Sequence, residues 1–158
     1  MTFLDLAKQR YSVRAYQDRE VEDEKLAYVL EAARMAPTGS NRQAFQLVVV
    51  HTKDRRSDMR RLYGQDWFGD APIIICACAD PNYGLNVGIV MDHLILAAAD
   101  QGLGTCWIGA FNRDAAREIL GIPDDMAPVI MATLGYAADA PRPKRRKALD
   151  DLVRYEHW

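Results

Sequence analysis

The sequence lacks several features that define large protein classes. Its three cysteines are odd in number and none is spaced as Cys-x-x-Cys, which argues against a disulfide framework and against a zinc site. The apolar runs, of which residues 73–79 are typical, are interrupted too soon to span a bilayer. No Gly-x-Gly-x-x-Gly or P-loop motif follows a predicted strand, so the common dinucleotide fingerprint is absent. We therefore expect reduced core cysteines, no metal and no membrane segment.

Charge of one sign is not in excess either. Lys and Arg number 20 and Asp and Glu number 22, a net charge of −2, so nothing attracts the whole molecule to nucleic acid or to a membrane. The first residues lack the basic and apolar regions of a signal peptide, from which we expect a cytoplasmic protein. One basic cluster, residues 141–147, fits a solvated tail, a nucleic-acid patch or part of a phosphate site; aromatic residues are not interleaved with it as a stacking platform requires.

The length of 158 residues and the hydrophobic content of 49% suffice for one packed domain, which we expect to span residues 1–158. Strands and helices are predicted in an order that does not alternate strictly. This order favours an α+β fold, a central sheet flanked by helices, over a doubly wound parallel sheet. Hydrophobic periodicity predicts helices at residues 2–9, 20–35, 54–62, 87–101 and 113–120, strands at 45–51, 72–79, 105–110 and 127–135, and an aromatic-rich loop at 63–70.

The predicted helix at residues 87–101 is apolar on nearly every side, since Val, Ile, Leu, Met and Ala occupy most of its positions. Such a helix must be covered all round, and a chain of this size can bury few helices in that way. We therefore expect part of this helix to lie in a subunit interface.

Two arginines flank a serine in residues 10–14 (Arg-Tyr-Ser-Val-Arg). Guanidinium groups bind phosphate through paired hydrogen bonds, and the hydroxyl of Ser12 adds a further donor. The segment therefore suits a phosphate group, although two arginines near a helix end are also typical of a solvated face.

Two further segments are compatible with a planar ligand. Residues 37–43 form a loop between a helix and a strand, and the amides of Asn41 and Gln43 both donate and accept hydrogen bonds, as a heterocycle edge requires. Residues 102–109 (Gly-Leu-Gly-Thr-Cys-Trp-Ile-Gly) follow the apolar helix, and their glycines allow backbone to approach a ring closely. Taken alone, the first segment is better explained as an ordinary helix stop, and the second as a helix cap followed by a core strand.

The order of these motifs resembles the FMN-dependent nitroreductase family. Arg-x-Ser-x-Arg, Ala-Pro-x-x-x-Asn-x-Gln, Gly-Leu-Gly-x-x-Trp-Ile-Gly and a late Lys-x-Arg follow one another over nearly the whole chain. The resemblance implies an α+β homodimer with a mostly antiparallel central sheet, one nitroreductase-like domain per chain, and FMN bound at the dimer interface.

The resemblance also implies a set of cofactor-binding residues. One group holds the phosphate and ribityl end, a second comes from the other subunit, and a third lies beside the isoalloxazine ring near N5. The phosphate group includes Arg10, Ser12, Arg14, Lys144 and Arg146; the loop from the other subunit includes Pro37, Thr38, Gly39 and Asn41; Ile108 and Gly109 lie near the ring; and Tyr11 and Gln43 complete the expected cofactor-binding set.

The activity that the resemblance implies is hydride transfer from NADH or NADPH by way of FMN to an electron-poor acceptor, such as a nitroaromatic or a quinone, in a ping-pong cycle. No catalytic side chain is then required, because the cofactor carries the chemistry. A cation, Arg14 or Lys144, is expected near the N1–C2 carbonyl of the ring. The alternatives are a flavin reductase, a dehalogenase-like or an enoate-reducing enzyme of the same fold, a flavin-storing protein without turnover, or a nucleic-acid module.

Several positions depart from the family pattern. Ala44 and Phe45 stand where Pro-Trp is common, Tyr11 stands where a basic residue or His is common, and Gln65 is only a loose candidate for a polar contact with the ring. Residues 63–86 leave little room for the helical insertion that covers the flavin in longer members. The identity of the electron acceptor is therefore the property for which the resemblance gives the weakest prediction.

Overall fold

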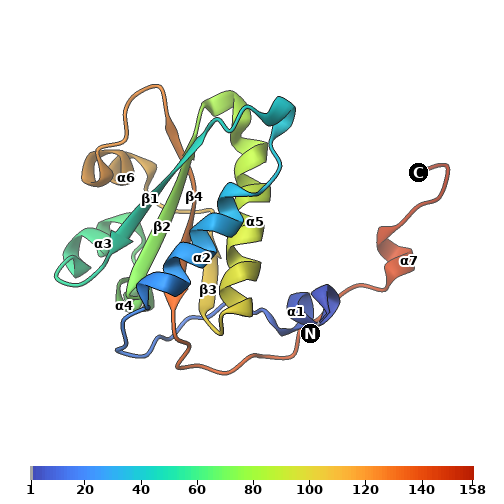
Figure 1. Cartoon of the computed structure of the whole chain (residues 1–158), viewed down its shortest axis with the longest axis horizontal. Helices are drawn as coiled ribbons and strands as arrows, with labels where there is room; N and C mark the ends of the chain where they lie inside the picture. Colours follow the sequence, from blue (N-terminus) through green and yellow to red (C-terminus); the bar gives the residue numbers. More distant parts are fainter. Residues whose placement is uncertain (1) are drawn as a thin grey trace.

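The computed structural model describes residues 2–158 and centres on a four-stranded antiparallel sheet (Figure 1). The strands lie in the order β1-β2-β4-β3, so the two central strands are β2 and β4. The predicted strands at 45–51 and 127–135 are confirmed at both ends, and the other two differ by one or two residues. The strands are β1 (Phe45–His51), β2 (Ile73–Ala79), β3 (Gly104–Ile108) and β4 (Ala127–Gly135).

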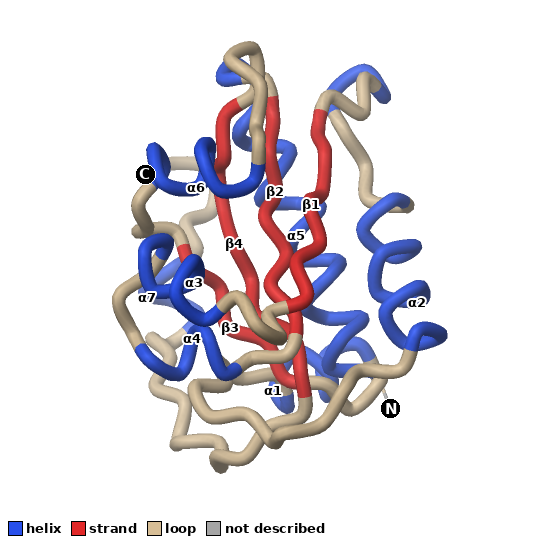
Figure 2. Tube along the Cα trace, turned by 90° about the vertical axis from the view of Figure 1, so that its left-hand side faces the viewer, coloured by secondary structure: helices blue, strands red, loops and turns tan. Residues whose placement is uncertain are grey.

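Helices cover both faces of the sheet (Figure 2). Helices α2 (Asp23–Arg34) and α5 (Gly84–Asp100) pack on one face, and α3 (Arg56–Leu62), α4 (Asp66–Asp70) and α6 (Arg113–Leu120) pack on the other. The predicted α+β fold is thus confirmed. The observed helix ends differ from the predicted ones by at most three residues, because capping contacts set the exact ends of a helix. The remaining elements are α1 (Phe3–Gln9), η1 (Gly39–Asn41), η2 (Pro81–Tyr83) and α7 (Leu149–Leu152).

Strand β2 joins the two halves of the core. All seven of its residues are buried, and they alternate between the faces: Ile73 and Ile75 pack with α2 and α5, whereas Cys76 and Cys78 pack with α3 and α6. All three cysteines are buried and free, as expected. The contact with the neighbouring Cys78 thiol, together with burial, raises the pKa of Cys76, which therefore stays protonated.

The segment at 63–70, predicted as a loop, contains the short helix α4. Phe68 and Gly69 are buried there, and Phe68 makes edge-to-face contacts with Tyr63 and Trp67. The prediction was wrong because five residues are too few for a helical period to show, and because Gly69 reads as a helix breaker. Gly69 packs against α3, and a Cβ there would lie at an ordinary packing distance, 3.6 Å, from that of Met59.

Helix α5 is covered by its own chain on only part of its surface. Seven of its residues, Met91 and Leu94 among them, are buried against the sheet and α2. Leu85 and Ile89, one helical turn apart, are 87% and 37% exposed. The helix therefore keeps an uncovered apolar stripe, and the expected subunit interface stays a prediction that this stripe favours.

The C-terminal residues run away from the body of the molecule (Figure 1). Helix α7 buries none of its residues, and Leu149, Leu152, Tyr155 and Trp158 are all largely exposed. We call residues 148–158 the C-terminal arm. Within residues 2–158, no helix has both the length and the apolar character needed to cross a membrane.

Candidate functional site

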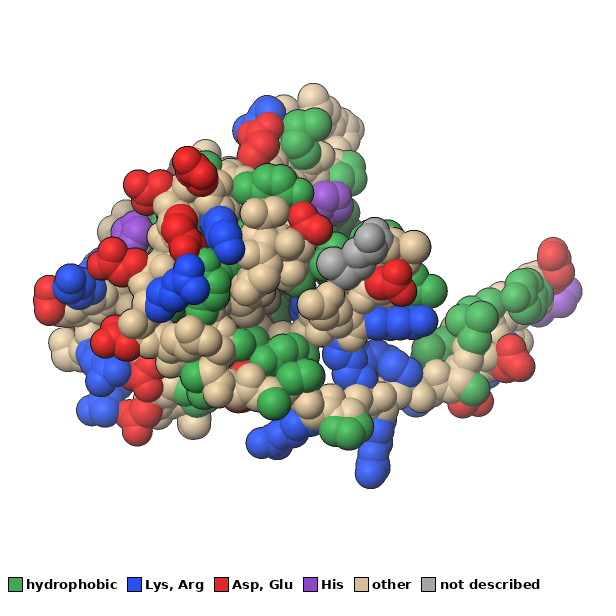
Figure 3. All heavy atoms as spheres, turned by 60° about the horizontal axis from the view of Figure 1, so that its bottom comes forward, with side chains coloured by type: hydrophobic (Ala, Val, Ile, Leu, Met, Phe, Trp, Pro, Cys, Tyr) green, Lys and Arg blue, Asp and Glu red, His purple; other side chains and the backbone are tan. Residues whose placement is uncertain are grey.

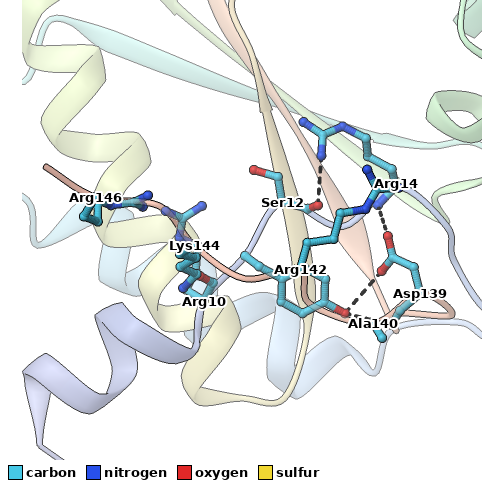
Figure 4. Close-up of a pocket in the computed structure, with 9 residues that line it drawn as sticks. Arg10, Ser12, Arg14, Asp139, Ala140, Arg142, Lys144 and Arg146 are labelled. Atoms are coloured by element: carbon cyan, nitrogen blue, oxygen red, sulfur yellow. Dashed lines mark hydrogen bonds between the residues drawn. The ribbon is translucent and has the colours of Figure 1, made fainter.

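A basic pocket of about 410 Å³ lies between the N-terminal segment and the C-terminal tail (Figure 4). Five of its side chains are cationic and one is a carboxylate. Figure 3 shows Lys and Arg side chains gathered where the tail leaves the body. The basic pocket is lined by Arg10, Tyr11, Ser12, Arg14, Asp139, Ala140, Arg142, Lys144 and Arg146.

The sheet positions the N-terminal wall of this pocket. Ser12 forms a parallel bridge with Thr105 of β3, and the N–H of Val13 donates to the Thr105 carbonyl at 2.9 Å. The side chain of Val13 is 1% exposed, so it anchors the segment in the core. Residues 10–14 therefore run alongside the edge of β3, with their polar side chains at the pocket.

Two glycines of residues 102–109 have structural roles. Gly102, with φ 72°, follows α5 as the helix-cap interpretation requires. A Cβ on Gly104 would lie 2.5 Å from Cγ2 of Val13. The close approach at Gly104 is thus made by residues 10–14, which favours the core-strand interpretation of this glycine over a contact with a planar ligand.

We expect Gly104→Ala to lower the free energy of unfolding by about 1–3 kcal/mol, because the added methyl group overlaps the buried Val13 side chain. Urea unfolding followed by circular dichroism measures the change. Gly64→Ala is the matched control, since no atom lies within 4 Å of a Cβ built there. Equal stability of the two variants would contradict the packing argument.

Lys144 ties the tail to the end of α1. Its ammonium donates to the carbonyls of Ala7, Lys8 and Arg10. Burial, followed by the nearby Arg10 and Arg146, lowers the pKa of Lys144. This contact brings three cations together, as Figure 4 shows on one side of Ser12. Like charges gathered in this way favour a bound anion.

Asp139 ties the tail to the same segment at the other end of the pocket. Its Oδ2 accepts a hydrogen bond from the backbone N–H of Arg14 at 2.8 Å. The hydroxyl of Tyr11 donates to the Asp139 carbonyl at 2.9 Å and to its Oδ1 at 3.2 Å. Burial, and then the adjacent Asp139 charge, raise the pKa of Tyr11, so the hydroxyl keeps its proton.

The loop at residues 37–43 is held in an unusual backbone conformation. Ser40, Asn41 and Gln43 have φ values of 51°, 52° and 51°, a region that non-glycine residues occupy at a cost. The N–H of Gly39 donates to Oδ1 of Asn86 at 2.9 Å, which fixes the loop against α5. Backbone strain of this kind clusters at functional sites.

A single chain does not bring this loop to the basic pocket. Figure 1 shows η1 at the upper end of the sheet and the segment after α1 at the lower end. The basic pocket therefore brings together six of the predicted cofactor-binding residues: Arg10, Tyr11, Ser12, Arg14, Lys144 and Arg146. The loop residues lie apart from it, namely Pro37, Thr38, Gly39, Asn41 and Gln43.

Ile108 and Gly109 lie along the same strand edge as Ser12. The Ile108 side chain is 5% exposed and packs in the core, so only its backbone is available to a ligand. Gly109 is open, since a Cβ there would meet nothing within 4 Å, and its carbonyl accepts from Arg113 at 3.1 Å. Gln65 is exposed at the start of α4. Over residues 2–158, no group of His, Cys, Asp and Glu is placed to hold a metal ion.

Comparisons with known proteins assign the chain to a family. The model of the Nitroreductase family matches residues 7–68 and 58–136. The chain belongs to the nitroreductase family. A putative NADH dehydrogenase/NAD(P)H nitroreductase of Archaeoglobus fulgidus is 32% identical over 144 residues, 82% of this chain and 82% of that protein. An FMN reductase [NAD(P)H] of Bacillus subtilis is 29% identical over 163 residues, 85% of this chain and 66% of that protein.

The nitroreductase fold extends over the full chain. The crystal structure of a nitroreductase family protein from Clostridium difficile superposes with a TM-score of 0.91 and 36% identity, covering 100% of both chains. Because the match covers both chains completely, that solved protein has the same short length as this nitroreductase.

Three pocket residues of this nitroreductase are absent from the predicted set: Asp139, Ala140 and Arg142. Arg142 belongs to the predicted basic cluster, which offered no reason to separate it from its neighbours. Asp139 stands among alanines in residues 137–140, and no local pattern marks it. Only the pairing of the tail with residues 10–16 reveals its contacts, through the bridge between Tyr16 and Ala137.

Proposed function

We propose that the protein is an FMN-dependent oxidoreductase that passes hydride from NADH or NADPH by way of FMN to an electron-poor acceptor, in a ping-pong cycle. The family and the names of the relatives support an NAD(P)H-dependent oxidoreductase. The observation that carries the choice of FMN is the basic pocket, whose cations suit a phosphate monoester. FMN ends in one phosphate monoester, whereas a dinucleotide flavin continues from its phosphates into a second nucleotide.

The donor set of the pocket fits the phosphate of FMN. Arg10 and Arg146 present guanidinium groups that make no ion pair within residues 2–158, and Ser12 adds a hydroxyl between them and Arg14. These groups would hold the phosphate as a dianion and orient the rest of the cofactor along β3. The span from Thr105 to Gly109 is about 13 Å at the usual rise per residue, which suits a ribityl chain that leads to a ring.

We propose that a second copy of the chain completes the site. The amides of Asn41 and Gln43 suit the edge of the ring but lie far from the pocket of their own chain. The uncovered stripe on α5 and the exposed C-terminal arm supply apolar surface for association. The functional unit is accordingly a homodimer of single-domain subunits with two composite sites.

FMN supplies the reversible hydride chemistry when it is bound, and the chain binds and orients it. Arg14 is the better placed cation for the ring edge, because its side chain makes only one hydrogen bond within the described chain, to the Ser12 carbonyl at 3.2 Å. Lys144, by contrast, uses its donors on the carbonyls at the end of α1. A fixed positive group at that position stabilises negative charge that develops on the cofactor.

The test is the visible spectrum of the purified protein, followed by anaerobic addition of NADH and of NADPH. We expect a flavin spectrum, FMN as the extracted cofactor, and bleaching by at least one nucleotide, with recovery when a quinone or a nitroaromatic is added. A colourless protein that takes up no added FMN would contradict the proposal. Bound FMN that neither nucleotide bleaches would instead identify a flavin-storing protein.

A further inference from the structure

We propose that Asp139 is a positioning residue for the FMN phosphate: it holds the backbone of Arg14 and the hydroxyl of Tyr11 so that the N-terminal wall of the basic pocket faces the tail. This inference rests on the function proposed above. Asp139 is a carboxylate, and a carboxylate is unexpected in a site for an anion because the two negative charges repel each other.

Asp139 is one of two ties that set the width of the pocket. At the end of the pocket where Asp139 lies, the tail pairs with residues 14–16. The N–H of Ala138 donates to the Ala15 carbonyl at 2.8 Å, and Asp139 accepts hydrogen bonds from Arg14 and Tyr11. At the other end Lys144 holds the carbonyls around residues 7–10. Figure 4 shows Ser12 between these two contacts, with Arg10 and Arg146 beside Lys144 at one end and Arg14 beside Asp139 at the other.

The charge of Asp139 opposes the ligand. Its carboxylate shares the pocket with five cations and would repel a phosphate dianion, which lowers affinity if charge is all that it contributes. Its hydrogen bonds have the opposite effect, because they fix the segment that carries Arg10, Ser12 and Arg14. The two roles thus predict opposite changes in the affinity for FMN when the side chain of Asp139 is replaced.

The experiment measures the dissociation constants of FMN and riboflavin for the full-length apoprotein, by quenching of flavin fluorescence. The variants are Asp139→Asn, which keeps an acceptor for the Arg14 N–H but removes the charge, and Asp139→Ala, which removes both. We expect Asp139→Asn to bind FMN as tightly as the wild type or more tightly, and Asp139→Ala to bind it about tenfold more weakly. Riboflavin lacks the phosphate but keeps the ring that Arg14 would face, so its affinity should change much less than that of FMN.

A third variant keeps the inference falsifiable if Asp139→Ala does not fold. Asp139→Glu preserves the charge but moves the carboxylate by one methylene, so positioning predicts weaker FMN binding and charge alone predicts no change. Tighter FMN binding by both Asp139→Asn and Asp139→Ala would overturn the inference. Equal loss of FMN and riboflavin affinity would also overturn it, since that indicates a general structural role. A wild type that does not prefer FMN over riboflavin contradicts the proposed function itself.

Discussion

Replacing Arg10 and Arg14 together by alanine is expected to release FMN from a chain that stays folded. Both guanidinium groups line the basic pocket, and hydrogen bonds to charged groups contribute about 1.5–3 kcal/mol each, so the affinity for FMN should fall by at least about 100-fold. The structural cost is small, because the only hydrogen bond of the Arg14 side chain among residues 2–158 is the one to Ser12. Flavin fluorescence titration and thermal unfolding of the apoprotein measure the two effects.

The matched control removes two arginines far from the pocket. Arg34 and Arg60 form exposed ion pairs with Glu31 and Asp66, and such pairs contribute little to stability. Arg34→Ala/Arg60→Ala should keep the wild-type affinity for FMN at the same ionic strength. If the pocket variant retained FMN as this control does, the phosphate would have to bind elsewhere.

Mixing two inactive variants is expected to restore activity. The first variant is Arg10→Ala/Arg14→Ala. The second is Asn41→Gly/Gln43→Gly, which removes both amides while glycine tolerates φ values of 52° and 51°. If each site combines the pocket of one chain with the loop of the other, a heterodimer has one site with both lesions and one intact site. Random exchange makes half of the dimers mixed, so activity should reach about a quarter of the wild-type value.

Two measurements make the mixing experiment decisive. Native mass spectrometry confirms that subunits have exchanged, and each variant incubated alone gives the background rate. Activity that stays at background although heterodimers are present would show that the loop acts within its own chain or not at all. A folded monomer at micromolar concentration would rule out the composite site altogether.

The fold was predictable because its strands are short and strongly patterned. The strands at residues 45–51 and 127–135 are predicted at both ends because each is an apolar run that follows Asn or Asp within four residues. Helix α5 is predicted to be too apolar for one chain to cover, and its exposed Leu85 and Ile89 are consistent with that prediction without testing it. The short α4 was missed, since five residues carry no detectable period.

The candidate site was predictable only where its chemistry is local in sequence. Residues 10–14 place two arginines and a serine together, so a phosphate site could be inferred from composition and spacing. Asp139 contacts residues more than 120 positions away, and no local pattern predicts such a contact. The role proposed for Asn41 requires a second chain, so its geometry follows neither from the sequence pattern nor from one subunit.

The pairing of Ser12 and Val13 with Thr105 has a consequence for solubility. β3 is an edge strand, and the unpaired backbone groups of an edge are a template for aggregation with other chains. Residues 12–13 occupy part of that edge with a bridge and a backbone hydrogen bond. A change that detached this segment would therefore remove the proposed phosphate ligands and, at the same time, open a strand edge to intermolecular pairing.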